Sequence, residues 1–276
     1  MKYCNQAWEL LEQGCFSEAA QLYQKILQSR KHDPAIWNNR GYCLLKQGKI
    51  EEALLCCQQA LKLAPRDTAV LINTGFCYQR LGLWTEAYQC FAAARRNGAG
   101  DADLLNNIAA CLAQLNRIEE AVDLYRQALD LAPRQGEIIA NLAAALAQGQ
   151  RWPEAIDSLE AALQLLPEDV SVLNNAAACL EALGKYYLAT PLYVRALALQ
   201  PEDLQVRQNY AACLIKQRRF AEARAILEEL LHLEPGHRAG WQLLGTLYEA
   251  TGDPETAARC YNRAWGLVPA EKETKG

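Results

Sequence analysis

Residues 102 to 135 read ADLLNNIAACLAQLNRIEEAVDLYRQALDLAPRQ, and this 34-residue stretch sets the period of the whole chain. Laid over the remaining sequence in steps of 34, it aligns eight copies without an insertion or a deletion. Apolar residues recur at helical spacing on both sides of Asn116-Arg117, and the second run stops at Pro133. The pattern predicts two helices joined by a short turn. Neither helix can bury its apolar face alone, so consecutive copies must stack into an array.

Several columns of the repeat accept one kind of side chain when Ala102 is counted as position 1. Position 20 is alanine in all eight copies, and position 8 is only alanine or glycine, as the close crossing of two helices requires. Aromatic residues recur at positions 4, 11 and 24, and proline at position 32 ends six of the second helices. These columns predict helix pairs that cross closely, with aromatic side chains between them.

The same columns resemble the tetratricopeptide repeat, whose pattern is W-x3-G from position 4, then a tyrosine at 11, an alanine at 20, an aromatic residue at 24 and a proline at 32. The resemblance extends over residues 1 to 269. It implies an all-α fold, an α-solenoid in which antiparallel helix pairs form a right-handed superhelix and the first helices line a concave groove. It also implies a role in protein–protein interaction.

We expect one array over residues 1–269 and a disordered tail at 270–276. Its repeats are expected at 1–33, 34–67, 68–101, 102–135, 136–169, 170–203, 204–237 and 238–269. The third repeat ends in Asn97-Gly98-Ala99-Gly100 instead of the usual proline, which predicts an early helix end and a bend at 97–101.

The chain has eleven cysteines, and five of them share position 10 of the first helix: Cys43, Cys77, Cys111, Cys179 and Cys213. Residues in one column lie about a repeat apart, so we interpret these thiols as small hydrophobic side chains and not as disulfides. No CxxC pair is present, and we expect no metal site. The cysteine content favours a reducing compartment.

The location is expected to be cytoplasmic. Met1 already falls at position 2 of the first repeat, which leaves no room for a signal peptide, and no run reaches the roughly 18 apolar residues of a membrane span.

Charge is unevenly distributed along the chain. Residues 102–203 carry 6 Lys or Arg against 14 Asp or Glu, a net charge of −8. No basic stripe of the kind that binds nucleic acid is present, so a nucleic-acid partner is not expected. The acidic middle either steers a basic partner or is simply a set of solvated helix faces, and the sequence leaves both readings open.

The sequence does not indicate an enzyme. Its only histidines are His32, His232 and His237, and none has a serine, cysteine or carboxylate partner in a catalytic motif. His232 and His237 flank a Pro-Gly pair that favours a turn over a metal site. No nucleotide fingerprint is present, so we predict no catalytic residues and no cofactor.

Position 6 is the column that points to function, because it is asparagine in seven of eight repeats. Asparagine is mildly unfavourable within a helix, so propensity does not explain the column. An amide can pair with the main chain of an extended peptide, or it can bridge neighbouring helices. The column consists of Asn5, Asn39, Asn73, Asn107, Asn141, Asn175 and Asn209.

Two neighbouring columns complete the predicted groove. Position 9 carries aromatic residues in the first three repeats, and position 5 adds further amides: Trp8, Tyr42, Phe76, Asn38, Asn106 and Asn174. Amide contacts alone would give weak binding, so we expect apolar anchors at the aromatic end of the groove.

The sequence therefore predicts a non-catalytic adaptor or assembly factor that binds an extended protein or peptide segment in its groove. The alternative is a self-associating scaffold that uses its terminal repeats and outer surface. No polar helix covers the last repeat near Ala257 and Cys260, which makes homo-oligomers through that repeat a second hypothesis.

Overall fold

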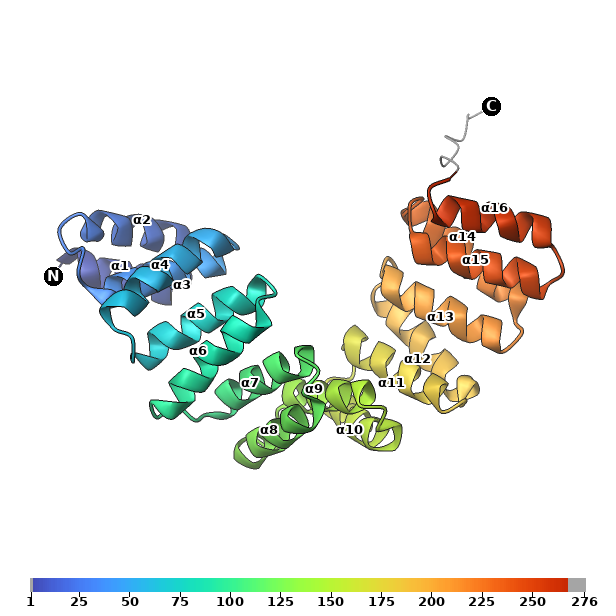
Figure 1. The fold of residues 1–276 in the computed structure, drawn as a ribbon, viewed down its shortest axis with the longest axis horizontal. Helices are drawn as coiled ribbons and strands as arrows, with labels where there is room; N and C mark the ends of the chain where they lie inside the picture. The colour runs from blue at the N-terminus through green and yellow to red at the C-terminus, as the bar shows by residue number, and fades with distance from the viewer. Residues whose placement is uncertain (1, 268–276) are drawn as a thin grey trace. The chain divides into compact units, whose positions relative to one another are not determined.

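The computed structural model describes residues 2–267, in which sixteen helices follow one another in pairs and no strand occurs (Figure 1). The odd-numbered helix is the first of each repeat and the even-numbered helix the second. The helices are α1 Lys2–Glu12, α2 Phe16–Leu27, α3 Pro34–Lys46, α4 Ile50–Leu63, α5 Thr68–Arg80, α6 Trp84–Arg96, α7 Ala102–Gln114, α8 Ile118–Leu131, α9 Gly136–Gln148, α10 Trp152–Leu165, α11 Val170–Ala182, α12 Tyr186–Leu199, α13 Leu204–Lys216, α14 Phe220–Leu233, α15 Arg238–Ala250 and α16 Pro254–Ala264. The predicted all-α solenoid is confirmed. The tail predicted at 270–276 lies outside the described residues.

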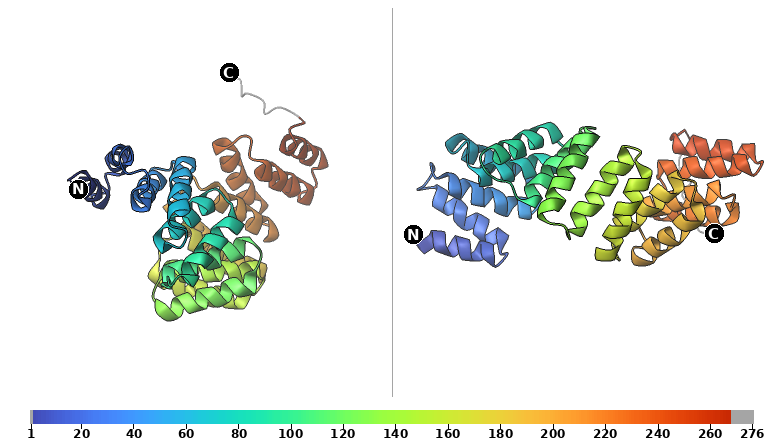
Figure 2. Two further views of the ribbon diagram at one scale, coloured as in Figure 1. Left: turned by 60° about the vertical axis from the view of Figure 1, so that its left-hand side comes forward. Right: turned by 90° about the horizontal axis from the view of Figure 1, so that it is seen from below.

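The chain forms two compact units, residues 1–145 and 146–276. In the first unit α2 packs on α3, α4 on α5 and α6 on α7. In the second, α10 packs on α11, α12 on α13 and α14 on α15. Figure 2 shows this order of stacking in the N-terminal unit, coloured from blue to green. Each unit is therefore a stack of helix pairs, while the bend expected at 97–101 stays a prediction.

The first helices of consecutive repeats lie closer together than the second helices. Direct contacts join α3 to α5, α11 to α13 and α13 to α15. Among the described residues, no comparable contact joins consecutive second helices within either unit. A stack that is tighter along one row of helices curves toward that row. The first helices therefore form the inner face of each unit, and the second helices form the outer face.

The small-residue columns lie where the two helices of a repeat cross. All eight alanines at position 20 are buried, as are Gly41, Gly75 and Gly245 at position 8. A Cβ atom added to Gly75 would lie 2.7 Å from the Phe91 ring. This ring is fully buried and comes from position 24 of the same repeat. The close crossing predicted from the columns is confirmed.

The turn between the two helices of a repeat needs a left-handed residue at position 15. Glycine has this conformation in five repeats: Gly14, Gly48, Gly82, Gly184 and Gly252. Three repeats hold a residue with a side chain there, Asn116, Gln150 and Arg218, at φ values of 59 to 60°. The turn geometry is thus constant even where its residue is unfavourable.

An aspartate precedes most of the first helices and accepts a hydrogen bond from the first turn. The acceptors are Asp33, Asp67, Asp101, Asp169 and Asp203, at 2.8–3.1 Å from the backbone nitrogens of the first turn. His237 takes this place before α15, where its Nδ1 accepts from the Gly240 backbone N–H at 3.0 Å. The turn predicted around His237 therefore serves as a helix cap.

The repeat pattern is interrupted at two places. The early end predicted after the third repeat is present, because α6 stops at Arg96 and Gly98 follows with φ 102°. Pro191 does not break α12, which continues to Leu199. The helix accommodates it behind a tightened first turn, where the Leu188 N–H donates to the Lys185 carbonyl three residues earlier.

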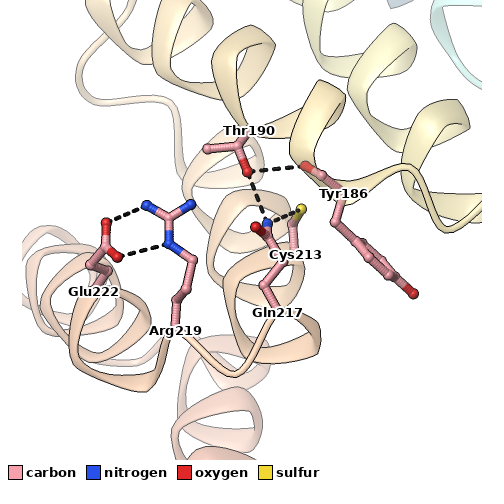
Figure 3. A network of polar contacts seen from close by, with 6 residues as sticks. All are labelled: Tyr186, Thr190, Cys213, Gln217, Arg219 and Glu222. Atoms are coloured by element: carbon pink, nitrogen blue, oxygen red, sulfur yellow. Dashed lines mark hydrogen bonds and ion pairs between the residues drawn. The ribbon is translucent and has the colours of Figure 1, made fainter.

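Glutamine side chains at position 14 tie a repeat to the one before it. Gln217, directly after α13, donates to the Thr190 hydroxyl of α12 at 2.9 Å and to the Cys213 sulfur at 3.3 Å (Figure 3). Gln47 similarly donates to the Phe16 carbonyl at the start of α2, at 2.9 Å. These bonds fix the end of a first helix against the second helix of the preceding repeat.

Candidate functional site

A hollow of about 240 Å³ opens on the inner face of the second and third repeats. Its lining consists of Tyr42, Leu45 and Lys46 from α3 and Phe76 and Arg80 from α5. The two aromatic residues lie at position 9 and the two cations lie one helical turn later, at position 13. The hollow therefore combines apolar walls with two positive charges.

Packing beneath the hollow holds its aromatic rings in place. The Phe76 ring meets the buried Phe91 ring edge-on, with centroids 5.4 Å apart, and Tyr42 meets Phe16 in the same way at 6.2 Å. The Lys46 ammonium lies 5.4 Å from the centre of the Tyr42 ring. Each ring thus presents a fixed apolar surface, and the Tyr42 ring has a cation beside it.

Trp8 is placed apart from the other two predicted anchors. It lies on α1 with 51% of its surface exposed and does not line the hollow. The structure therefore brings together Tyr42 and Phe76 of the three aromatic residues, and adds two cations that the sequence interpretation missed. The missing signal was the spacing of four residues from Tyr42 to Lys46 and from Phe76 to Arg80, which places them on one helix face.

The amides of positions 5 and 6 form bonds between consecutive repeats. Asn73 Nδ2 donates to Asn38 Oδ1 at 2.9 Å, and the same bond recurs 68 residues later from Asn141 to Asn106, at 3.0 Å. A third bond joins Asn209 to Asn174, at 2.9 Å. Three of the seven asparagines in the column thus bridge neighbouring repeats, as one of the two interpretations of the column requires.

The remaining amides of the column are placed differently. Asn39 donates to the Tyr23 hydroxyl at 3.4 Å, and Asn5 is exposed on α1. Asn107 and Asn175 are half-buried on α7 and α11, and within the described residues no protein hydrogen bond of either amide is recorded. Neither amide therefore forms a bridge of the kind that Asn73 and Asn141 form.

Burial keeps thiols of the cysteine column protonated. All eleven cysteines are free, and Cys43, Cys111 and Cys179 are buried in the stack. Burial raises the pKa of Cys43 and of Cys179 to about 11 and that of Cys111 to about 12, because the thiolate loses its solvation. At neutral pH these thiols are uncharged packing groups, as the sequence predicts.

Within residues 2–267, no three or more His, Cys, Asp or Glu side chains are grouped as metal ligands. None of the helices described here combines the length and apolarity of a membrane span.

Sequence comparison identifies one repeat family along almost the whole chain. Four profiles, each described as tetratricopeptide repeat, match residues 34–67, 66–134, 141–203 and, in two overlapping segments, 180–247 and 217–273. Comparison with curated proteins gives no match.

Solved structures show the same fold at low sequence identity. The Cut9 and Hcn1 hetero-tetramer of the APC/C contains a chain with a TM-score of 0.73 and 17% identity, covering 87% of this chain and 48% of that one. This protein therefore spans about half the length of that relative. A tetratricopeptide repeat protein from Parabacteroides merdae has a TM-score of 0.68 at 18% identity, with 91% and 94% coverage. YrrB, described as having an unusual peptide-binding site, has a TM-score of 0.56 at 21% identity, with 68% and 96% coverage.

Proposed function

Because the chain belongs to the tetratricopeptide repeat family, whose fold supports interactions between proteins, we propose that it is an adaptor or assembly factor that binds an extended segment of a partner protein. The segment lies along the inner face of the first unit, and the hollow lined by Tyr42, Lys46, Phe76 and Arg80 anchors it. The proposal includes a cytoplasmic location and a role without catalysis.

The hollow is the single observation that carries this proposal. Two aromatic walls accept an apolar side chain, and Lys46 and Arg80 at the rim favour an acidic residue next to it. Binding energy in such sites is concentrated in a few buried anchors. We therefore expect the partner segment to pair one large apolar residue with a nearby Asp or Glu.

The asparagine column has a smaller part in this proposal than the sequence predicts. Asn73 and Asn141 already use one amide hydrogen to bridge repeats, so Asn107 of α7 is the amide best placed to contact the peptide main chain in this unit. One amide bond contributes about 1 kcal/mol net. The column orients the segment, and the hollow supplies the affinity.

Selection of peptides from a displayed random library on the intact chain tests the proposal. We expect enriched peptides to share an apolar residue with a neighbouring carboxylate. Their affinity should fall at least about tenfold in the Tyr42→Ala variant and in the Lys46→Ala, Arg80→Ala double variant.

A matched control uses Lys62→Ala and Arg66→Ala, which remove two exposed cations of α4 and the loop after it, away from the hollow. Binding should be unchanged in this control. Equal losses in both double variants would show that only net charge matters, and enriched peptides without a carboxylate would contradict the assigned role of the cations.

A second candidate is self-association through the last repeat. A hollow of about 550 Å³ lies between α15 and α16, lined by Trp241, Leu244, Tyr248, Thr256, Arg259, Cys260 and Arg263. Trp241 Nε1 donates to the Pro235 carbonyl at 2.8 Å, so the hollow lies beside the preceding repeat, and we place the contact with a second copy there. Sedimentation of the intact chain and of an Arg259→Glu variant tests this candidate: an oligomer that the variant dissociates would support it, and a monomer at all concentrations would exclude it. Ala257 is a poor test site because it is fully buried.

A further inference from the structure

Helix α12 carries an apolar stripe on the outer face of the second unit. Its sequence, YYLATPLYVRALAL, contains one charged residue, Arg195. Tyr187, Pro191, Val194 and Ala198 repeat at helical spacing and are exposed, with 72% of the Tyr187 surface and 50% of the Val194 surface open to solvent. We call these four residues the α12 stripe. Leu188 and Leu199 extend it on one side.

Each of the other outer helices of this unit is charged at one or both of the same positions. Positions 22 and 25 hold Pro191 and Val194 in α12, but Asp157 and Glu160 in α10. α14 has Glu228 at position 25. A solenoid needs a polar outer surface for solubility, so an apolar stripe on one outer helix is not a requirement of the fold.

Negative charge borders the stripe. α10 contains three acidic residues and no basic one. At the other side, a hollow of about 490 Å³ begins two residues after the end of α12, and its lining includes Glu202, Glu228, Glu229 and Arg207. Arg207 pairs with Glu229, and Arg224 pairs with Glu228 at 3.2 Å, while no ion pair of Glu202 is recorded. Arg207 and Arg224 balance Glu229 and Glu228, which leaves Glu202 as the carboxylate of this lining without an ion pair in the described residues.

From this arrangement we propose that the α12 stripe docks an amphipathic helix of a partner protein whose apolar face is bordered by Lys or Arg. The apolar face covers Tyr187 and Val194, and a basic side chain enters the hollow beside Glu202. The stripe belongs to a second helix, on the other side of the repeats from the inner face. The proposal therefore does not depend on peptide binding at the inner face.

The charges around the stripe argue against two other occupants. In a symmetric contact centred on α12, the acidic helices α10 and α14 would approach α10 or α14 of the second copy, and like charges would oppose association. An anionic membrane would be repelled in the same way. A basic amphipathic helix is the occupant for which the apolar area and the acidic border both favour binding.

The test uses the full chain and three fluorescent peptides of about 18 residues, long enough for five helical turns. The first is an amphipathic Leu/Lys helix, the second has Glu in place of each Lys, and the third has the composition of the first in a non-amphipathic order. Anisotropy titrations compare the native chain with a Tyr187→Gln, Val194→Gln double variant. The matched control replaces two exposed leucines of other outer helices, Leu55→Gln and Leu131→Gln.

We expect the Leu/Lys helix to bind the native chain and the control variant alike, at least about tenfold more tightly than the double variant. The Glu-substituted and non-amphipathic peptides should bind at least about tenfold more weakly than the Leu/Lys helix. Equal binding to the double variant, or equal binding of the Glu peptide, would overturn the proposal.

Two further outcomes would also overturn it by assigning the stripe to another occupant. One is a dimer of the native chain that the double variant abolishes, as measured by sedimentation. The other is binding to phosphatidylcholine vesicles that the same variant abolishes. Circular dichroism spectra of the variants should match that of the native chain, because both substitutions are at exposed helix positions.

Discussion

At the scale of single residues, the stack depends on positions where one atom decides whether two helices fit. Gly75 allows the buried ring of Phe91 to lie against its backbone. The alanines of position 20 are buried and leave no room for a larger side chain. Interiors packed to this density do not absorb an added methyl group without a shift of the backbone or of a ring.

The Gly75→Ala substitution should lower the free energy of unfolding by about 1 to 3 kcal/mol, because the new Cβ would meet the Phe91 ring at 2.7 Å. Urea denaturation followed by circular dichroism measures the change. Gly100→Ala is the matched control: no atom lies within 4 Å of its added Cβ, and the effect should stay within about 0.5 kcal/mol. Equal effects of the two substitutions would contradict the packing argument.

Arg218→Gly should stabilise the chain by about 1 kcal/mol, since Arg218 adopts φ 60° in a turn where five other repeats have glycine. The midpoint of urea unfolding should rise. Arg218→Ala removes the same side chain but keeps a Cβ, so it should bring no such gain. A rise in both variants would attribute the effect to the loss of charge and not to the backbone.

At the scale of helices and repeats, bonds between amides link first helices across the repeat boundary. Asn106 of α7 accepts a hydrogen bond from Asn141 of α9, while Asn107, the next residue, has no recorded bond in the described chain. Two adjacent asparagines of one helix therefore have different roles, one structural and one proposed for binding.

This difference predicts opposite results for two neighbouring substitutions. Asn106→Ala should cost about 1 to 2 kcal/mol of stability, because it leaves the half-buried Asn141 amide without its acceptor. Asn107→Ala should leave stability unchanged or slightly higher, since alanine is the better helix former, while weakening peptide binding. Denaturation midpoints and peptide affinities of the two variants are the measurements. A loss of stability in both would make the whole column structural.

The sequence predicted the helix pairs and their crossing, because a 34-residue period and an invariant alanine record a steric requirement directly. The glycines of position 15 and residues such as Asp101 mark the left-handed turn and the aspartate caps, which the repeat columns alone do not assign. The bond from Asn141 to Asn106 could not be predicted from the sequence. The repeat pattern shows which residue types recur at a position, but not which positions of neighbouring repeats lie in contact. Lys46 and Arg80 were missed for a related reason, since only positions 5, 6 and 9 were assigned to the inner face.

At the scale of the whole molecule, the buried thiols make stability depend on pH on the alkaline side. Cys43 and Cys179 have a pKa of about 11 in the folded chain and Cys111 one of about 12, against an ordinary value of 9.0. Above pH 9 the unfolded chain releases these protons while the folded chain keeps them. The free energy of unfolding therefore falls as pH rises from 9 toward 11 to 12, and the contribution is intact below 9.

We expect the urea midpoint of the native chain to fall between pH 9.0 and about 11, the values that bracket the Cys43 shift. A Cys43→Ala, Cys111→Ala, Cys179→Ala variant should start from a lower midpoint at pH 7, because it loses packing, but should show a shallower fall. Tyrosines and lysines titrate in both proteins, so the difference between the two slopes isolates the thiols. Identical slopes would contradict the assignment.

The bonds from Asn73 to Asn38, from Asn141 to Asn106 and from Asn209 to Asn174 divide the array into blocks of two repeats, 34–101, 102–169 and 170–237, each with its own bond inside. Such a block is a natural unit for rebuilding the protein at another length. If residues 102–169 were deleted, Asp101 would directly precede Val170 and could cap α11 as Asp169 does now. Cutting one repeat later or earlier would separate the two amides of a pair, so lengthened or shortened versions of this scaffold should be cut only at block boundaries.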